Sequence, residues 1–172
     1  MVPLATWSGS CQRLVVPHVT IVRDLLLTAL MVLFWIIEQS GARSVPVQVA
    51  AGVFTAIVGF LLHEWAHLAG ARWTASQVLY PNRVLAPLLF HFDCKANGRS
   101  QFLAMSYGGY LGSLIGVGLI LLLAPLDRLS GQVALGLAGV GMVVTLLAEV
   151  PTTLRVLRGG PLPTGYAFDP PK

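Results

Sequence analysis

The sequence has few charged residues. Asp, Glu, Lys and Arg make up only 10% of its 172 residues, whereas a soluble globular domain carries about 25%. Hydrophobic residues make up 55% of the chain, and the mean hydropathy is +0.75. A soluble domain needs more charged residues than this to form a polar surface. We therefore interpret the chain as an integral membrane protein. Its length allows one domain.

Cysteines and clusters of basic residues are also scarce. The 2 cysteines, Cys11 and Cys94, lie far apart in the sequence, and they do not imply a disulfide framework. The net charge is only +4, and the basic residues are spread over several loops, which excludes nucleic acid as a partner. The partners that remain are membrane lipids and other membrane proteins, as substrates or as partner subunits.

The chain contains apolar segments of roughly the length that crosses a bilayer, which takes about 20 helical residues. They cover residues 21–37, 45–71, 102–125 and 132–150. Within residues 72–100, the apolar run 84–90 is too short to cross, which favours a re-entrant or interfacial segment. We therefore predict an all-α integral membrane protein with four transmembrane helices and a re-entrant or interfacial segment between the second and the third.

Residues outside these helices complete the predicted organisation. Residues 1–22 form an amphipathic or irregular N-terminal segment, residues 23–158 the transmembrane domain, and residues 159–172 an extended C-terminal tail. The third helix is rich in glycine, and small residues about four apart allow helices to pack closely. The predicted packing residues are Gly108, Gly109, Gly112 and Gly116.

The basic residues predict how the chain is oriented. With four spans, the N-terminus, residues 72–100 and the C-terminus share one side of the membrane. That side carries nine Lys or Arg residues and the other side only Arg43 and Arg128. Cytoplasmic loops carry the excess of basic residues, so we expect both termini to face the cytoplasm.

The second predicted helix contains the motif His63-Glu64-x-x-His67. Residues four apart lie on the same helical face, so both imidazoles can bind one zinc ion, and Glu64 can act as a general base. Ionisable groups are costly to bury in a membrane helix and by default mark a functional site. The competing interpretation is a polar helix end packed within the bundle, with Glu64 as a structural carboxylate.

A second cluster of candidate ligands lies in the 72–100 segment. His91, Asp93 and Cys94 all have side chains that can bind zinc or contact a substrate. The competing interpretation is a surface loop with an incidental free thiol.

The stretches Leu62-His63-Glu64-Trp65-Ala66-His67 and Ser106-Tyr107-Gly108-Gly109-Tyr110-Leu111-Gly112 resemble motifs of the site-2 protease (M50) family of intramembrane zinc metalloproteases. The resemblance covers about residues 45–158. It implies a core of three transmembrane helices, a membrane-embedded hairpin within residues 72–100, and zinc-dependent hydrolysis of peptide bonds in membrane-embedded substrates. We expect a multi-pass protein of a bacterial inner membrane.

The resemblance also suggests a third zinc ligand, because a catalytic zinc usually has three protein ligands. The family places an aspartate on its third core helix, usually in a Leu-Asp-Gly context. The nearest counterpart here is Glu149, within Leu147-Ala148-Glu149-Val150-Pro151. Pro151 should loosen the turn that holds Glu149, and Asp93 is the next candidate.

Because this chain has Glu149 where the family has an aspartate, two alternatives remain. Glu149 could instead pair with Arg155 or Arg158 at the membrane interface. The chain could then be a divergent, catalytically inactive relative that serves as a scaffold subunit of a larger membrane complex.

Overall fold

The structure is a computed structural model that describes residues 16–81 and 88–165. Most of the expected N-terminal segment, residues 84–87 of the short apolar run and the last part of the expected tail lie outside the described residues. Of the 2 cysteines, only Cys94 is described.

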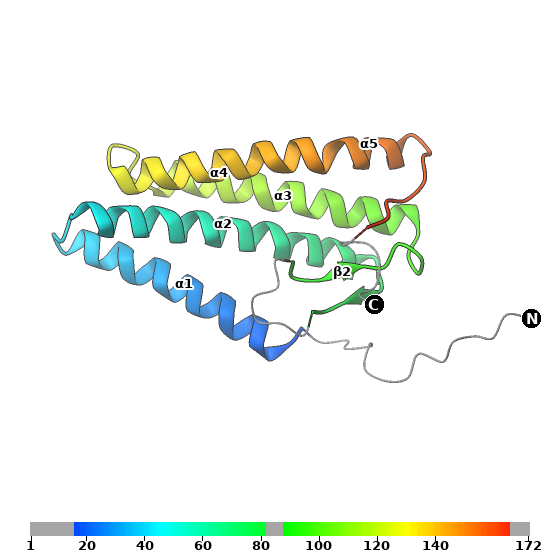
Figure 1. Ribbon diagram of the computed structural model, residues 1–172, viewed down its shortest axis with the longest axis horizontal. Coiled ribbons are helices and arrows are strands. Elements are labelled where there is room, and N and C mark those ends of the chain that lie inside the picture. Colours follow the sequence, from blue (N-terminus) through cyan, green and yellow to red (C-terminus); the bar gives the residue numbers. More distant parts are fainter. Residues whose placement is uncertain (1–15, 82–87, 166–172) are drawn as a thin grey trace, which may run out of the picture.

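Long helices account for most of the described chain (Figure 1). They are α1 (His18–Gln39), α2 (Val45–Trp73), α3 (Arg99–Leu123) and α4 (Leu129–Ala148), which continues after Glu149 as the short helix α5 (Val150–Leu157). Counting α4 and α5 together, 4 helices of the described residues are long and apolar enough to cross a membrane. The predicted all-α fold with four spans is confirmed, and the chain is a multi-pass membrane protein.

Proline residues mark where several of these helices begin. Pro17 directly precedes α1, and α2 and α5 each carry a proline in the first turn, where the missing backbone N–H is not needed. Helix α1 begins at His18, four residues before the end of the segment that we expected to be irregular. Helix α1 is therefore longer than the apolar segment 21–37 that predicted it.

Helix α2 lies at the centre of the bundle and contacts α1, α3 and α4. Figure 1 shows α1 diverging from α2 towards its N-terminal end. The contact with α3 is close because glycines face the α2 backbone: a methyl group on Gly108 would overlap the Ala66 carbonyl, and one on Gly112 would overlap the Ala66 side chain. Further along α3, a methyl group on Gly116 would just touch the Gly59 carbonyl oxygen, at 3.6 Å. The predicted packing glycines thus lie at the α2–α3 contact.

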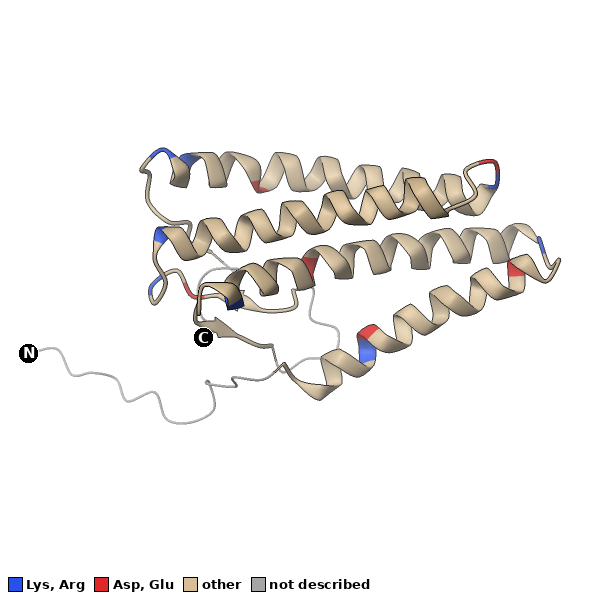
Figure 2. Cartoon of the chain, turned by 180° about the vertical axis from the view of Figure 1, so that it is seen from behind, with Lys and Arg blue, Asp and Glu red and all other residues tan. Residues whose placement is uncertain are grey.

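A short hairpin connects α2 and α3. Strand β1 (Val78–Leu79) pairs antiparallel with β2 (His91–Phe92), with Val78 opposite Phe92. The hairpin closes the main apolar core of the described residues, which contains Leu68, Ala71, Tyr80, Leu89, Phe90, Phe92, Phe102, Met105 and Val156. Figure 2 shows few charged residues between the ends of the long helices. The outer faces of these helices expose large apolar side chains such as Leu122 and Leu147.

Candidate metal centre

Helix α2 carries three buried polar side chains along the His63–His67 motif. His63, Glu64 and His67 are each less than 10% exposed. The helix is continuous through the motif, so the imidazoles of His63 and His67 lie on one face, with ring centroids 4.4 Å apart. This is the arrangement that the i, i+4 spacing predicts.

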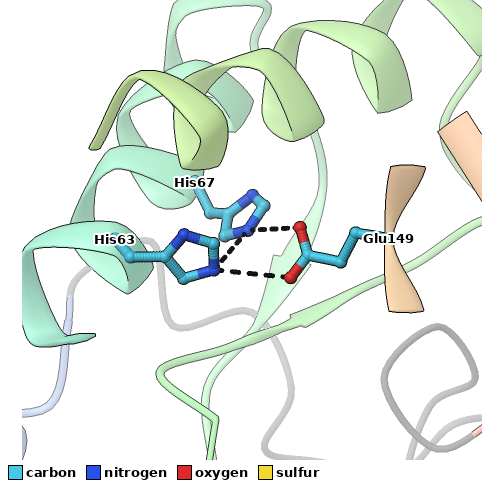
Figure 3. A group of neighbouring side chains, drawn as sticks. All are labelled: His63, His67 and Glu149. Carbon is cyan, nitrogen blue, oxygen red and sulfur yellow. Dashed lines mark hydrogen bonds and ion pairs between the residues drawn. The ribbon is translucent and has the colours of Figure 1, made fainter. Parts of the chain in front are cut away.

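Glu149 faces both imidazoles from the end of α4 (Figure 3). Its Oε1 lies 3.4 Å from His63 Nε2, its Oε2 lies 3.4 Å from His67 Nε2, and the two Nε2 atoms are 3.0 Å apart. One potential ligand atom from each residue lies within 4.8 Å of the others. We call His63, His67 and Glu149 the triad; the structure brings together the three residues that the sequence nominated.

The other nitrogen of each imidazole is held by the backbone of α3. His63 Nδ1 lies 3.0 Å from the Gly109 carbonyl oxygen, and His67 Nδ1 lies 2.9 Å from that of Met105. A carbonyl oxygen can only accept a hydrogen bond, so each Nδ1 carries the hydrogen and donates it. When the imidazoles are neutral, their Nε2 lone pairs then point at one place beside a carboxylate, an arrangement that a cation would stabilise and that histidine ligands of metals commonly show.

Glycine is needed where α3 passes the triad. A methyl group on Gly109 would overlap the His67 imidazole, so this residue lets the ring lie against the α3 backbone. The Ser113 hydroxyl, one turn further along α3, is 2.8 Å from His63 Nδ1 and also contacts the ring. The role that we predicted for Gly109, helix packing, thus extends to shaping the site.

Glu149 lies at a short interruption between α4 and α5. Glu149 ends α4 with φ −97° and ψ −40°, and Pro151 lies in the first turn of α5. A proline in that turn has no N–H to donate to the preceding turn, as we expected from the sequence. Among the described residues, the Glu149 carboxylate lies 3.4 Å from Nε2 of both His63 and His67, and it forms no ion pair with Arg155 or Arg158.

A hydrogen bond between side chains ties α5 to α3 next to this interruption. The hydroxyl groups of Tyr110 and Thr153 are 2.7 Å apart, Thr153 is buried, and its N–H donates to the Glu149 carbonyl at 2.9 Å. Sequence reasoning missed this pair. Tyr110 follows Gly109 directly, but nothing in the sequence indicates a partner 43 residues away.

Glu64 is held in place from the hairpin side. Its Oε2 accepts the backbone N–H of Leu89 at 3.0 Å, which orients the carboxylate beside the triad. The neighbouring Trp65 donates its indole N–H to Asp24 of α1 at 2.8 Å. The sequence did not indicate this link between α1 and the motif.

Two cavities flank the triad. One of about 270 Å³ borders His67 and is lined by aromatic residues of the hairpin and α3. The other, of about 290 Å³, borders His63 and extends along α4. Both are lined in part by Glu64, Leu88, Ala148 and Glu149, so the triad and Glu64 lie where the two cavities meet.

The second predicted cluster does not join the triad. His91 is buried in β2, and Asp93 Oδ1 accepts the backbone N–H groups of Lys95 at 2.9 Å and Ala96 at 3.3 Å, so its carboxylate stabilises a turn. Cys94 is partly buried and forms no disulfide among the described residues. Among residues 16–81 and 88–165, the triad is the one group of three potential metal ligands that come together.

Comparisons of the chain with models of protein families, with curated proteins and with solved structures found no match.

Proposed function

We propose that this chain is an intramembrane zinc metalloprotease-like protein, which hydrolyses peptide bonds of membrane-embedded substrates. The observation that carries the proposal is the convergence of both Nε2 lone pairs on the Glu149 carboxylate while each Nδ1–H is held by a backbone carbonyl. Two imidazoles and one carboxylate are a ligand set found in catalytic zinc sites.

The triad residues fit zinc in number, type and arrangement. When bound there, zinc would polarise the substrate carbonyl as a Lewis acid. The backbone carbonyls of Gly109 and Met105 would hold the rings in orientation, as hydrogen-bond partners of metal-binding histidines commonly do.

Glu64 is suited to move the proton in peptide hydrolysis. Water adds to the carbonyl carbon, the C–N bond breaks, and one proton of the water must reach the leaving nitrogen. A carboxylate beside the reacting bond can take that proton and return it. Glu64 has this place, since it lines both cavities and is oriented by Leu89 N–H.

The cavities support an extended apolar substrate. They meet at the triad, and their walls are largely apolar, including Phe90, Phe92 and Phe102 on one side and Leu137 and Met142 on the other. Enclosed apolar clefts with a few convergent polar groups are typical of binding sites. A peptide segment that lies across both cavities would present one of its bonds to Glu64.

We also propose that both termini face the cytoplasm of a cell with a bacterial inner membrane. The support for this orientation is the distribution of basic residues, nine on the proposed cytoplasmic side and two on the other. Reporter fusions at the C-terminus and in the loop around Arg43 would test this orientation.

The decisive experiment is Glu64→Gln, compared with the parent on a co-expressed membrane substrate. Glutamine can still accept the Leu89 N–H but cannot act as a base, so we expect zinc content to persist and cleavage to fall about 10²- to 10⁴-fold. Equal cleavage by both proteins would contradict the role of Glu64. A zinc-loaded parent that cleaves none of a panel of membrane substrates would favour the inactive scaffold subunit instead.

A further inference from the structure

A further, elongated cavity lies away from the triad, towards the α1–α2 and α3–α4 loops. Its volume is about 550 Å³, within the range of ligand-binding cavities. We call it the α1–α3 groove. Its walls come from α1, α2, α3 and the following loop, namely Met31, Trp35, Gln39, Thr55, Val58, Gly59, Leu62, Gly116, Leu119, Ile120, Leu123, Ala124, Pro125 and Arg128.

The groove runs along α1. Met31, Trp35 and Gln39 are spaced four apart and line the same wall, which gives a length of about 12 Å at 1.5 Å per residue. The polar groups along its middle satisfy each other, since Trp35 donates to the Thr55 hydroxyl at 2.8 Å and that hydroxyl donates to the Ala51 carbonyl at 2.8 Å. The body of the groove is therefore apolar.

The loop end of the groove is polar and positively charged. It is formed by Gln39 and Arg128. The described ion pair of Arg128 is to Glu38, at 3.7 Å, which is longer than a hydrogen bond. A guanidinium has five N–H donors, and this side chain is 29% exposed, so it can bind an anionic group of a ligand.

We propose that the α1–α3 groove binds one acyl chain of a bilayer phospholipid, with the lipid phosphate at Arg128. An apolar groove with one basic end matches an acyl chain with an anionic headgroup. The orientation also agrees, because the groove lies on membrane-spanning helices and its basic end lies at their ends, where headgroups are found. Arginine binds phosphate oxygens through paired N–H groups.

Trp35 lines the groove and allows a direct test. The purified full chain in detergent is titrated with phosphatidylglycerol or phosphatidylcholine that carries brominated acyl chains, which quench nearby tryptophan fluorescence. The signal of Trp35 is the difference between the parent and Trp35→Phe. We expect brominated phosphatidylglycerol to quench Trp35 at a mole fraction about fivefold lower than brominated phosphatidylcholine requires. One basic residue near a membrane surface gives a preference of this size for anionic lipid.

Two pairs of variants separate this site from the general lipid surface. Arg128→Gln should abolish the fivefold preference, while Arg43→Gln removes the same charge from the exposed neighbouring loop and should leave it unchanged. Val58→Phe fills the groove and should reduce quenching of Trp35 by either lipid. Leu122→Phe adds the same ring to an exposed position that does not line the groove and should not.

Three results would overturn the proposal. The first is the absence of Trp35 quenching by either phospholipid. The second is equal quenching by both lipids that neither Arg128→Gln nor Val58→Phe changes, which indicates unspecific lipid contact. The third is quenching by a brominated free fatty acid that phospholipid does not compete away. The test measures lipid and not metal or cleavage, so its failure leaves the proposed function untouched.

Discussion

Two polar clusters lie at opposite ends of α4, and they differ in how their hydrogen bonds are arranged. At one end, the triad collects acceptors: two Nε2 lone pairs and a carboxylate face one another. At the other end, Glu38 is fully buried and faces donors, the Ser130 hydroxyl at 3.0 Å and the Arg128 guanidinium at 3.7 Å. We call Glu38, Ser130 and Arg128 the Glu38 cluster.

The difference separates a site that needs a ligand from one that mainly joins helices. Acceptors that converge repel one another unless a cation lies between them, and burial strengthens the effect. Donors that face an acceptor satisfy one another, although Glu38 Oε2 has no hydrogen-bond partner among the described residues. We therefore expect changes in the triad to alter metal binding with little effect on folding. Changes in the Glu38 cluster should lower the stability of the fold with little effect on metal binding.

The largest expected effect is loss of metal on removal of a histidine of the triad. His63→Ala and His67→Ala should each lose most of the zinc that the parent binds, because a ligand is lost, and the affinity should fall more than about 100-fold. Zinc per chain, measured on purified protein by elemental analysis, checks this. His18→Ala, at the start of α1, is the matched control and should keep its zinc; unchanged zinc in both triad variants would rule out the metal site.

The next largest effect concerns folding at the other end. Glu38→Ala removes the acceptor of Ser130 and the ion-pair partner of Arg128, and it leaves a buried cavity. We expect the free energy of unfolding to fall by about 2–3 kcal/mol, with zinc per chain unchanged. Denaturant unfolding in detergent measures the first and elemental analysis the second. If Glu38→Ala unfolds like the parent but loses zinc, the proposed difference between the triad and the Glu38 cluster is wrong.

A smaller loss of affinity is expected when the third triad residue is neutralised. Glu149→Gln keeps the size of the side chain but removes its charge, so zinc affinity should fall about 10- to 100-fold while both imidazoles remain. Competition with a zinc chelator of known affinity measures the shift. If Glu149→Gln binds zinc like the parent while Asp93→Asn binds it more weakly, Asp93 and not Glu149 is the third ligand.

The smallest effect tests how Glu149 is positioned. Tyr110→Phe removes the hydrogen bond to Thr153 and lets the start of α5 move, so zinc affinity should fall about fivefold, the equivalent of one hydrogen bond of about 1 kcal/mol. Tyr107→Phe removes a hydroxyl one turn earlier on the same helix and is the control. Thr153→Val should match Tyr110→Phe, and the double variant should lose no more than either; a fully additive loss would show that the two hydroxyls act separately.

Local sequence patterns were sufficient to predict the four long helices and the two histidines of the site, but not helix α5 or the strands β1 and β2. The hydropathy of residues 45–71 indicated α2, and the spacing of His63 and His67 placed two imidazoles on one face, because both depend on helical periodicity alone. Pro151 indicated an interruption near Glu149 through the lack of one N–H. The resemblance of a few residues to a known family nominated Glu149 itself.

Only the tertiary structure decided the contacts between residues far apart in the chain. The Nδ1–H partners of the two histidines are backbone carbonyls of α3, which every residue possesses, so no sequence pattern marks them. The Tyr110–Thr153 and Glu38–Ser130 pairs join residues 43 and 92 positions apart, and their meeting depends on how closely glycines let the helices approach. The sequence by itself determined a membrane-spanning helical chain with two histidines on one face, because helical periodicity and hydropathy are local. Packing decided that their free lone pairs point at Glu149, because orientation depends on atoms that only the folded bundle brings near.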